Sequence, residues 1–185
     1  MNFYEWLGEL GPVNIDFPED EFQGWWMVEG RPVPEWDNKI VATLHGDDPA
    51  TFDFGLTENS WPVCSSKMRD FLATVVPGLV QYLPFRLHIE RDQSELTRFS
   101  VCQFLKLVDC LDRKRTRVRD NWQPINAFGD FATYRPFVLR RDLIEENKLF
   151  RINGKCRSIV VREDLKEAIE NAGFTGQRFD LVDVS

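Results

Sequence analysis

From Trp61 to the C-terminus, short apolar segments alternate with turn signals, and only a few segments have the spacing of a helix. The strand candidates are Val80–Ile89, Phe99–Cys110, Phe137–Leu139, Leu149–Ile152, Ser158–Val161 and Phe179–Val184. The polar connection Arg91–Glu95 is short enough for an antiparallel hairpin, and Asn153-Gly154 is the turn signal of a second one. Pro84 has no N–H to donate, which indicates an edge position or a bulge. These features predict an α+β fold with a mostly antiparallel β-sheet.

Two segments have helical spacing, and a third is long enough for a helical turn. Ser65 or Ser66 can cap a helix that runs to about Val76. Its apolar residues recur at i, i+3, i+4 and i+7: Met68, Phe71, Leu72 and Val75. A second helix is expected from Glu163 to Ala172, and a helical turn over Asp142–Asn147. The fold therefore contains two or three helices.

The first sixty residues lack this regularity. Turn signals occur at Gly11-Pro12, Phe17-Pro18, Gly30-Arg31-Pro32 and Asp47-Asp48-Pro49. Regular structure there is expected to be short, with strand candidates at Lys39–Leu44 and Thr51–Phe54. We expect a single domain over residues 1–185, in which an irregular, acidic, Trp-rich segment 1–60 packs on an α+β core of residues 61–185.

Charge divides the chain at the same place. The formal net charge is −7, yet residues 1–60 carry thirteen Asp or Glu against two Lys or Arg, whereas residues 61–185 have a net charge of +4. This balance argues against a general nucleic-acid-binding protein and favours a basic partner. Trp side chains flanked by carboxylates suit protein binding, because Trp supplies contact area and the charges attract a basic protein. The candidate partner-binding residues are Glu19, Asp20, Glu21, Trp25, Trp26, Trp36, Asp47, Asp48 and Asp53.

Catalysis is the alternative function that the residues leave open. A small α+β enzyme would use His45 with Asp47 or Cys64. A triad of Cys64, His45 and Asp47 can be written, but no local motif supports it. His88 lies in an alternating strand, opposite Leu87 and Ile89, and is interpreted as a surface or edge residue. The four cysteines, at positions 64, 102, 110 and 156, show no CxxC spacing and only two histidines accompany them, so no metal site is predicted. They are expected to be reduced thiols in strand or core surroundings.

The segment Arg113–Arg119 contains five Lys or Arg within seven residues and is the one candidate for phosphate contacts. The interleaved Thr116 and Val118 instead suggest a strand with its charges on the exposed face, and with a net charge of −7 no nucleic-acid partner is expected.

The sequence shows no targeting segment. Met1–Trp6 lacks a basic region and an apolar core, and the most apolar stretch, Phe71–Leu83, is interrupted by Pro77-Gly78. A cytoplasmic protein without a membrane partner is expected.

Several motifs of the last two-thirds are similar to a known family. They are the Ser-initiated helix ending in Pro77–Pro84, the strand end Val108–Asp112, Phe137–Leu139, Leu149–Ile152, and Val160–Ile169 followed by Gly173–Phe179. Over about residues 61–182 their order and spacing resemble the immunity protein eleven family of bacterial polymorphic toxin systems. The first sixty residues match only loosely.

The resemblance implies a cytoplasmic protein that binds and neutralises a cognate toxin by occluding its active site, with no catalysis of its own and no cofactor. The chemistry of the toxin does not follow from it. A basic toxin suits the acidic segment, and nucleic-acid-targeting toxins are one such class. The oligomeric state stays open.

Overall fold

The computed structural model describes residues 1–9, 12–18, 29–45, 52–57, 61–119, 121–124, 130–133 and 136–185. Among them are α1 (Ser66–Val75), α2 (Arg141–Ile144) and α3 (Glu163–Asn171), together with short strands in three larger sheets and one small one. Antiparallel pairings outnumber parallel ones among the described strands. The α+β class with a mostly antiparallel sheet is confirmed.

The sheets are named here by a member strand. The β1 sheet has the order β11 (Leu107–Val108), β13 (Leu149–Ile152), β14 (Lys155–Arg162), β1 (Phe3–Gly8) and β15 (Gln177–Leu181). The β10 sheet has the order β2 (Pro12–Val13), β5 (Phe54–Thr57), β6 (Pro62–Ser65), β10 (Phe99–Phe104) and β7 (Val80–Pro84). The β4 sheet has the order β3 (Ile15–Asp16), β4 (Val41–Leu44), β8 (Arg86–Ile89) and β9 (Ser94–Leu96). A parallel pair, β12 (Val138–Leu139) with β16 (Asp183–Val184), lies beside the β1 sheet.

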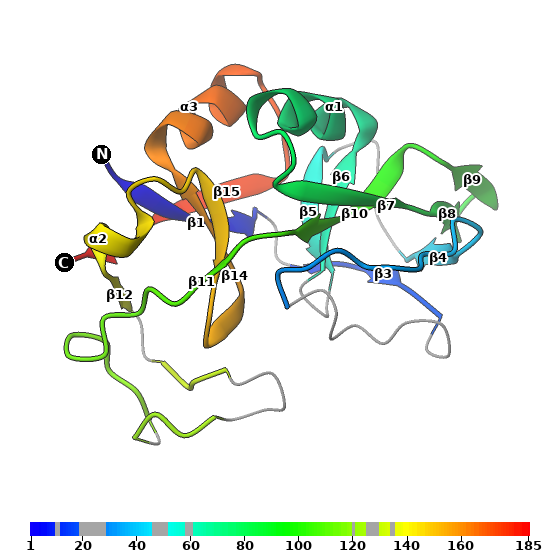
Figure 1. The fold of residues 1–185 in the computed structure, drawn as a ribbon. Helices are drawn as coiled ribbons and strands as arrows, with labels where there is room; N and C mark the ends of the chain where they lie inside the picture. Colours follow the sequence, from blue (N-terminus) through cyan, green and yellow to red (C-terminus); the bar gives the residue numbers. More distant parts are fainter. Residues whose placement is uncertain are drawn as a thin grey trace.

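Figure 1 shows α1 and α3 side by side above the β1 and β10 sheets. One buried cluster joins these two helices to both sheets, and it includes Trp6, Phe54, Leu72, Phe104 and Leu165. A second cluster fills the space between the β4 and β10 sheets, and a third lies between the β1 sheet and the segment that carries α2 and β12. The two large sheets therefore share one core, and the β4 sheet extends it away from the helices.

The local signals for the helices and for the second hairpin are confirmed. Ser65 is the N-cap of α1, and its hydroxyl oxygen accepts a hydrogen bond from the N–H of Met68 at 3.2 Å. β13 and β14 form an antiparallel hairpin, and Gly154 in its turn has a φ of +81°, a left-handed conformation that favours glycine.

The irregular character expected of residues 1–60 is wrong at the N-terminus, where β1 is a central strand paired with both β14 and β15. Phe3 packs in the third cluster and Trp6 in the first, so both faces of β1 are covered. A strand buried on both faces shows no apolar–polar alternation, which is why its sequence gives little signal.

Two strand candidates are each divided between two sheets. Val80–Ile89 breaks after Pro84 into β7, an edge strand as its proline indicated, and β8 in the β4 sheet. Phe99–Cys110 breaks after Phe104, and β11 joins the β1 sheet. Thr51–Phe54 is also misplaced, because the strand there runs over Phe54–Thr57. Lys39–Leu44 is confirmed as β4, which begins at Val41.

Candidate partner-binding surface

Most of the sequence-predicted partner-binding residues fall outside the described residues. They are Glu19, Asp20, Glu21, Trp25, Trp26, Asp47 and Asp48. The described residues that flank them are anchored in one region. Phe17 packs on Trp61 and Phe85, with ring centroids 5.1 and 5.0 Å away, and Phe52 stacks on Phe99 at 5.1 Å. Phe17 and Phe52 therefore both pack on the core between the β4 and β10 sheets.

Trp36 and Asp53 are the two candidates that the structure describes. Trp36 is half-buried against the same core, and its indole Nε1 donates a hydrogen bond to the carbonyl oxygen of Pro84 at 2.7 Å. Asp53 accepts hydrogen bonds from the Ser65 hydroxyl at 2.8 Å and from the backbone N–H of Thr175 at 3.2 Å. Asp53 therefore ties the N-cap of α1 to the loop before β15, which gives it a role in the fold.

The outer face of the β4 sheet carries a row of polar side chains. The strand registers place Asp16 of β3 beside Thr43 of β4, Thr43 beside His88 of β8, and His88 beside Glu95 of β9. The alternate residues, such as Ala42, Leu44 and Leu87, are buried in the core behind the sheet. We call Asp16, Thr43, His88 and Glu95, together with Glu90 at the end of β8, the β4 outer face. The interpretation of His88 as a surface residue is confirmed, since it is half-buried on this face.

His45 joins the two acidic ends of this face. Its Nδ1 lies 2.6 Å from a carboxylate oxygen of Glu90, and its Nε2 lies 3.2 Å from one of Asp16. The hydrogen bond to Glu90, with the charges of Glu90 and Asp16, raises the pKa of His45 above its ordinary value. When protonated, His45 therefore bridges the ends of β3 and β8 through these two carboxylates.

This bridge predicts a pH-dependent contribution to stability. Because the pKa of His45 is raised in the folded chain, its stabilisation is complete below the unfolded pKa of about 6.5 and is lost as the pH rises through the folded value. The melting temperature of His45→Gln should therefore fall further below wild type at about pH 5.5 than at about pH 8.5. Thermal denaturation at both pH values measures this. If His45→Gln lowers the melting temperature equally at both pH values, the bridge does not contribute. The same holds if the pH-dependent difference remains when His45→Gln is made in a chain that carries Asp16→Asn and Glu90→Gln.

The structure contradicts a catalytic pair of His45 and Cys64. Cys64 is fully buried in the core beneath α1, beside Cys102, whereas His45 lies at the far end of β4 between two carboxylates. All four cysteines are buried and free of disulfides, as expected. Burial raises the pKa of Cys110 to about 12 and of Cys156 to about 11, so neither supplies a ready thiolate.

The basic segment Arg113–Arg119 begins with a turn over residues 113–115, and its β-structure is limited to one antiparallel bridge between Val118 and Thr133, so the strand expected there is wrong. The Asp112 carboxylate accepts the backbone N–H groups of Lys114 at 2.9 Å and Arg115 at 3.1 Å, which closes the turn. The buried hydroxyl of Thr116 exchanges hydrogen bonds with the backbone of Val138 at 3.1 and 3.0 Å. These side-chain-to-backbone bonds hold the first part of the segment in a turn in place of a strand.

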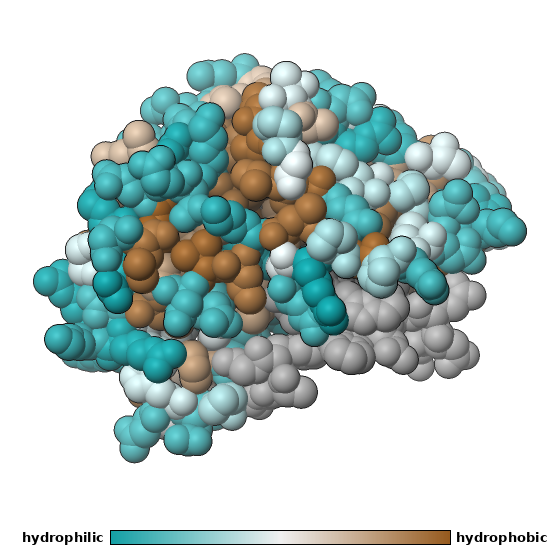
Figure 2. Space-filling view, viewed as in Figure 1, coloured by the Kyte–Doolittle hydropathy of each residue, from teal (hydrophilic) through white to brown (hydrophobic). Residues whose placement is uncertain are grey.

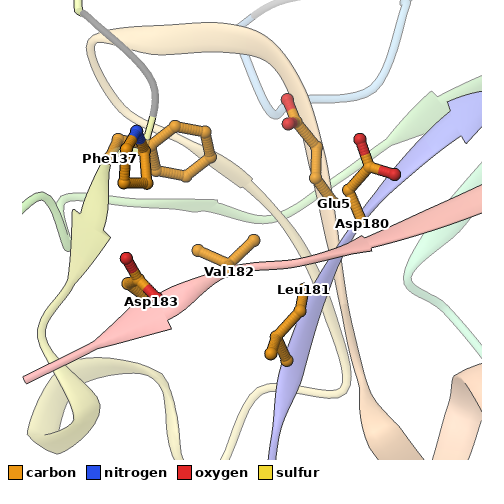
Figure 3. Close-up of a pocket in the computed structure, with 7 residues that line it drawn as sticks. Glu5, Phe137, Asp180, Leu181, Val182 and Asp183 are labelled. Carbon is orange, nitrogen blue, oxygen red and sulfur yellow. The ribbon is translucent and has the colours of Figure 1, made fainter.

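Two surface hollows lie away from the β4 outer face. One, of about 340 Å³, is bordered by β1, β15 and the residues just before β12. Figure 3 shows Glu5 and Asp180 directing their carboxylates to the same side of β1 and β15, while Leu181 points to the opposite side. Val182 and Phe137 form the apolar part of its lining, and Asp183 adds a third carboxylate.

The other hollow, of about 350 Å³, lies between the end of α1 and the connection from α2 to β13. Val75, Val76, Leu79 and Leu149 line it, with Lys106 and Lys148 among its polar residues. Figure 2 shows apolar residues in brown across this face of the molecule, with hydrophilic residues on both sides. Its two lysines do not match the acidic surface expected for a basic partner.

Within the described ranges, no group of three or more His, Cys, Asp or Glu is placed to hold a metal ion. No helix in the same part of the chain is long and apolar enough to cross a membrane.

A small α+β chain with an acidic first third is compatible with the class of immunity proteins that neutralise toxins in polymorphic toxin systems. A family model of that class matches residues 11–184, nearly the whole chain. The chain belongs to the Immunity protein family (Imm11), whose function is toxin neutralisation and whose members are typically non-catalytic. The match extends the resemblance from residues 61–182 into the acidic first third. No curated protein sequence matches the chain.

Proposed function

We propose that this chain binds the catalytic domain of a cognate toxin and covers its active site, without catalysing a reaction. The observation that carries the proposal is the charge division, in which residues 1–60 hold thirteen carboxylates against two basic side chains. Toxin neutralisation follows from the family, and the acidic segment supplies the electrostatic attraction that a basic active site needs.

The proposed contact surface combines two parts. The first is the acidic and aromatic set predicted from the sequence, namely Glu19, Asp20, Glu21, Trp25, Trp26, Asp47 and Asp48, together with Trp36. The second is the β4 outer face, which adds Asp16, Glu90 and Glu95, all exposed. In the sequence Asp47 and Asp48 follow closely after His45, whose side chain binds Asp16 and Glu90. In this proposal both parts present carboxylates to the toxin. On the β4 outer face Glu95 also pairs with Arg86 at 3.4 Å.

The partner is a basic toxin domain in the bacterial cytoplasm, and a nuclease or another nucleic-acid-modifying enzyme is the class that this charge suits best. In such a complex the carboxylates would occupy the groove that normally holds the phosphates of the substrate. Neither nucleic acid nor a membrane is a partner in this proposal.

A pair of charge-matched variants tests the surface. Glu19→Lys, Asp20→Lys and Glu21→Lys are introduced together, and the affinity for the purified toxin domain is measured by calorimetry at low and high salt. We expect 1:1 binding by the wild type that weakens with salt, and at least about a tenfold loss of affinity in the variant.

The control carries the same change of net charge on the helical side of the molecule, as Asp70→Lys, Glu167→Lys and Glu170→Lys. These side chains are exposed on α1 and α3, on the side away from the β4 sheet. Its affinity should stay close to that of the wild type. Equal losses in both variants would mean that the toxin responds to net charge alone and would contradict a localised acidic contact surface.

A further inference from the structure

β15 is an open sheet edge. It pairs with β1 on one side and has no strand on the other among the described elements. Two hydrogen bonds flank the pair, from Glu9 N–H to Gly176 O at 2.8 Å and from Val182 N–H to Phe3 O at 2.9 Å. They show which residues of β15 direct their backbone groups toward β1. Because bonded positions alternate along an antiparallel pair, Gln177, Phe179 and Leu181 direct their backbone N–H and C=O groups away from β1. In the described part of the chain these groups have no hydrogen-bond partner.

The other sheet edges are short or covered. β7 ends in Pro84, and the Gln81 side chain on this strand exchanges hydrogen bonds with the backbone of Val33 at 2.8 and 3.0 Å. β9 has three residues, and β2, β3 and β11 have two each. Native proteins usually shorten or cover an edge because unpaired backbone groups invite another strand. β15, with five residues, is therefore the longest open edge of the described strands.

The surroundings of this edge differ on the two faces of the sheet. On one face α3 packs on β14 and β1. On the other face lies the hollow of about 340 Å³ that Figure 3 shows. At the end of the strand the Leu181 side chain is 64% exposed, one of the most exposed large apolar residues described. An apolar side chain beside unpaired backbone groups favours a strand-adding partner.

We propose that β15 pairs antiparallel with β15 of a second copy of this chain, about a two-fold axis at Phe179. This register places Gln177 opposite Leu181 of the second copy and Phe179 opposite its equivalent. All three outward-facing residues of each chain then form hydrogen-bonded pairs. A two-fold contact of this kind is closed and uses the same residues twice.

The charges of β15 fit the same register. Arg178 lies opposite Asp180 of the second copy, and Asp180 lies opposite Arg178, so two oppositely charged cross-strand pairs form. Within one chain the Arg178 Nε lies 3.1 Å from the Asp180 carboxylate, and both side chains are substantially exposed. The outward-facing backbone groups and the Arg178–Asp180 pairs therefore both fit a second copy of the chain in the same register. The contact is short, and a dissociation constant in the micromolar range is expected.

A proline at Leu181 tests the backbone pairing. Its N–H points outward, so Leu181→Pro removes one intermolecular donor and leaves the bonds to β1 in place. Leu181→Ala shortens the side chain and keeps the donor. Sedimentation equilibrium without toxin, over about two decades of concentration, should show wild type and Leu181→Ala approaching twice the 21.7 kDa chain mass, with Leu181→Pro at the single-chain mass. Circular dichroism verifies that each variant is folded.

Exchanging the charges tests the register. Arg178→Asp gives a strand with two acidic side chains and Asp180→Arg one with two basic side chains, so each alone should remain monomeric. An equimolar mixture should form a heterodimer. A monomeric wild type at every concentration, or dimers that survive Leu181→Pro, would overturn the proposal. So would a monomeric wild type whose toxin affinity falls in Leu181→Pro, because the edge would then receive a toxin strand.

Discussion

Replacing Trp6 by alanine should lower the free energy of unfolding by about 3–5 kcal/mol, because it empties the largest side chain from the shared core. Trp6 is 1% exposed and stacks on Phe54 with ring centroids 4.2 Å apart and an interplanar angle of 23°. Phe104 and Phe179 lie at 6.1 and 5.9 Å. One side chain on β1 thus contacts β5, β10 and β15, so its loss loosens both large sheets. Guanidinium denaturation measures the change.

Trp6→Phe is the matched control. It keeps an aromatic ring against Phe54, and it removes a buried indole Nε1 that has no hydrogen-bond partner among the described residues. Trp6→Phe should lower the free energy of unfolding by less than about 2 kcal/mol. If Trp6→Ala and Trp6→Phe destabilise the chain equally, stacking in the shared core does not hold the two sheets together.

Gly176→Ala should destabilise the chain by about 3 kcal/mol or more, or prevent folding, because two separate costs coincide. Gly176 has a φ of +88°, which a residue with a Cβ adopts only under strain. A Cβ there would also lie 2.3 Å from the carbonyl oxygen of Phe54 and 2.8 Å from the Cβ of Phe52. The loop before β15 would have to separate from β5, which breaks the contact between the two large sheets.

Gly78→Ala separates these two costs. Gly78 has a φ of +75°, and a Cβ built there meets no atom within 4 Å. Gly78→Ala should lower the free energy of unfolding by only about 1–2 kcal/mol, because only the left-handed conformation is then unfavourable. Chemical denaturation measures the free energy of unfolding of both variants. If Gly176→Ala and Gly78→Ala destabilise the chain equally, close packing at Gly176 is unimportant.

Elements with local signals could be predicted from the sequence. The Ser65 cap and the apolar spacing after it define α1, and Asn153-Gly154 defines the turn of the β13–β14 hairpin. Each signal lies within a few residues of the structure that it specifies. A short-range hydrogen bond or backbone preference therefore suffices to read it.

Elements that depend on distant contacts could not be predicted. β1 has no alternation because the β1 sheet is covered on both faces, and the division at Pro84 reflects a change of sheet that only the β4–β8 pairing reveals. The site shows the same limit. Charge arithmetic identified an acidic first third, but it could not place Glu90 near Asp16 through His45, or Glu95 on the same face of the sheet. That proximity arises only when β3, β4, β8 and β9 pair in order.

Growth of cells that express the cognate toxin domain tests toxin neutralisation through the acidic surface. With the wild-type chain co-expressed, growth should be restored. With the Glu19→Lys, Asp20→Lys and Glu21→Lys variant, at the same expression level, protection should fall well below that of the helical-side control. Cells that die as fast with the wild-type chain as without it would contradict neutralisation itself, and full protection by the acidic-segment variant would contradict the surface proposed for it.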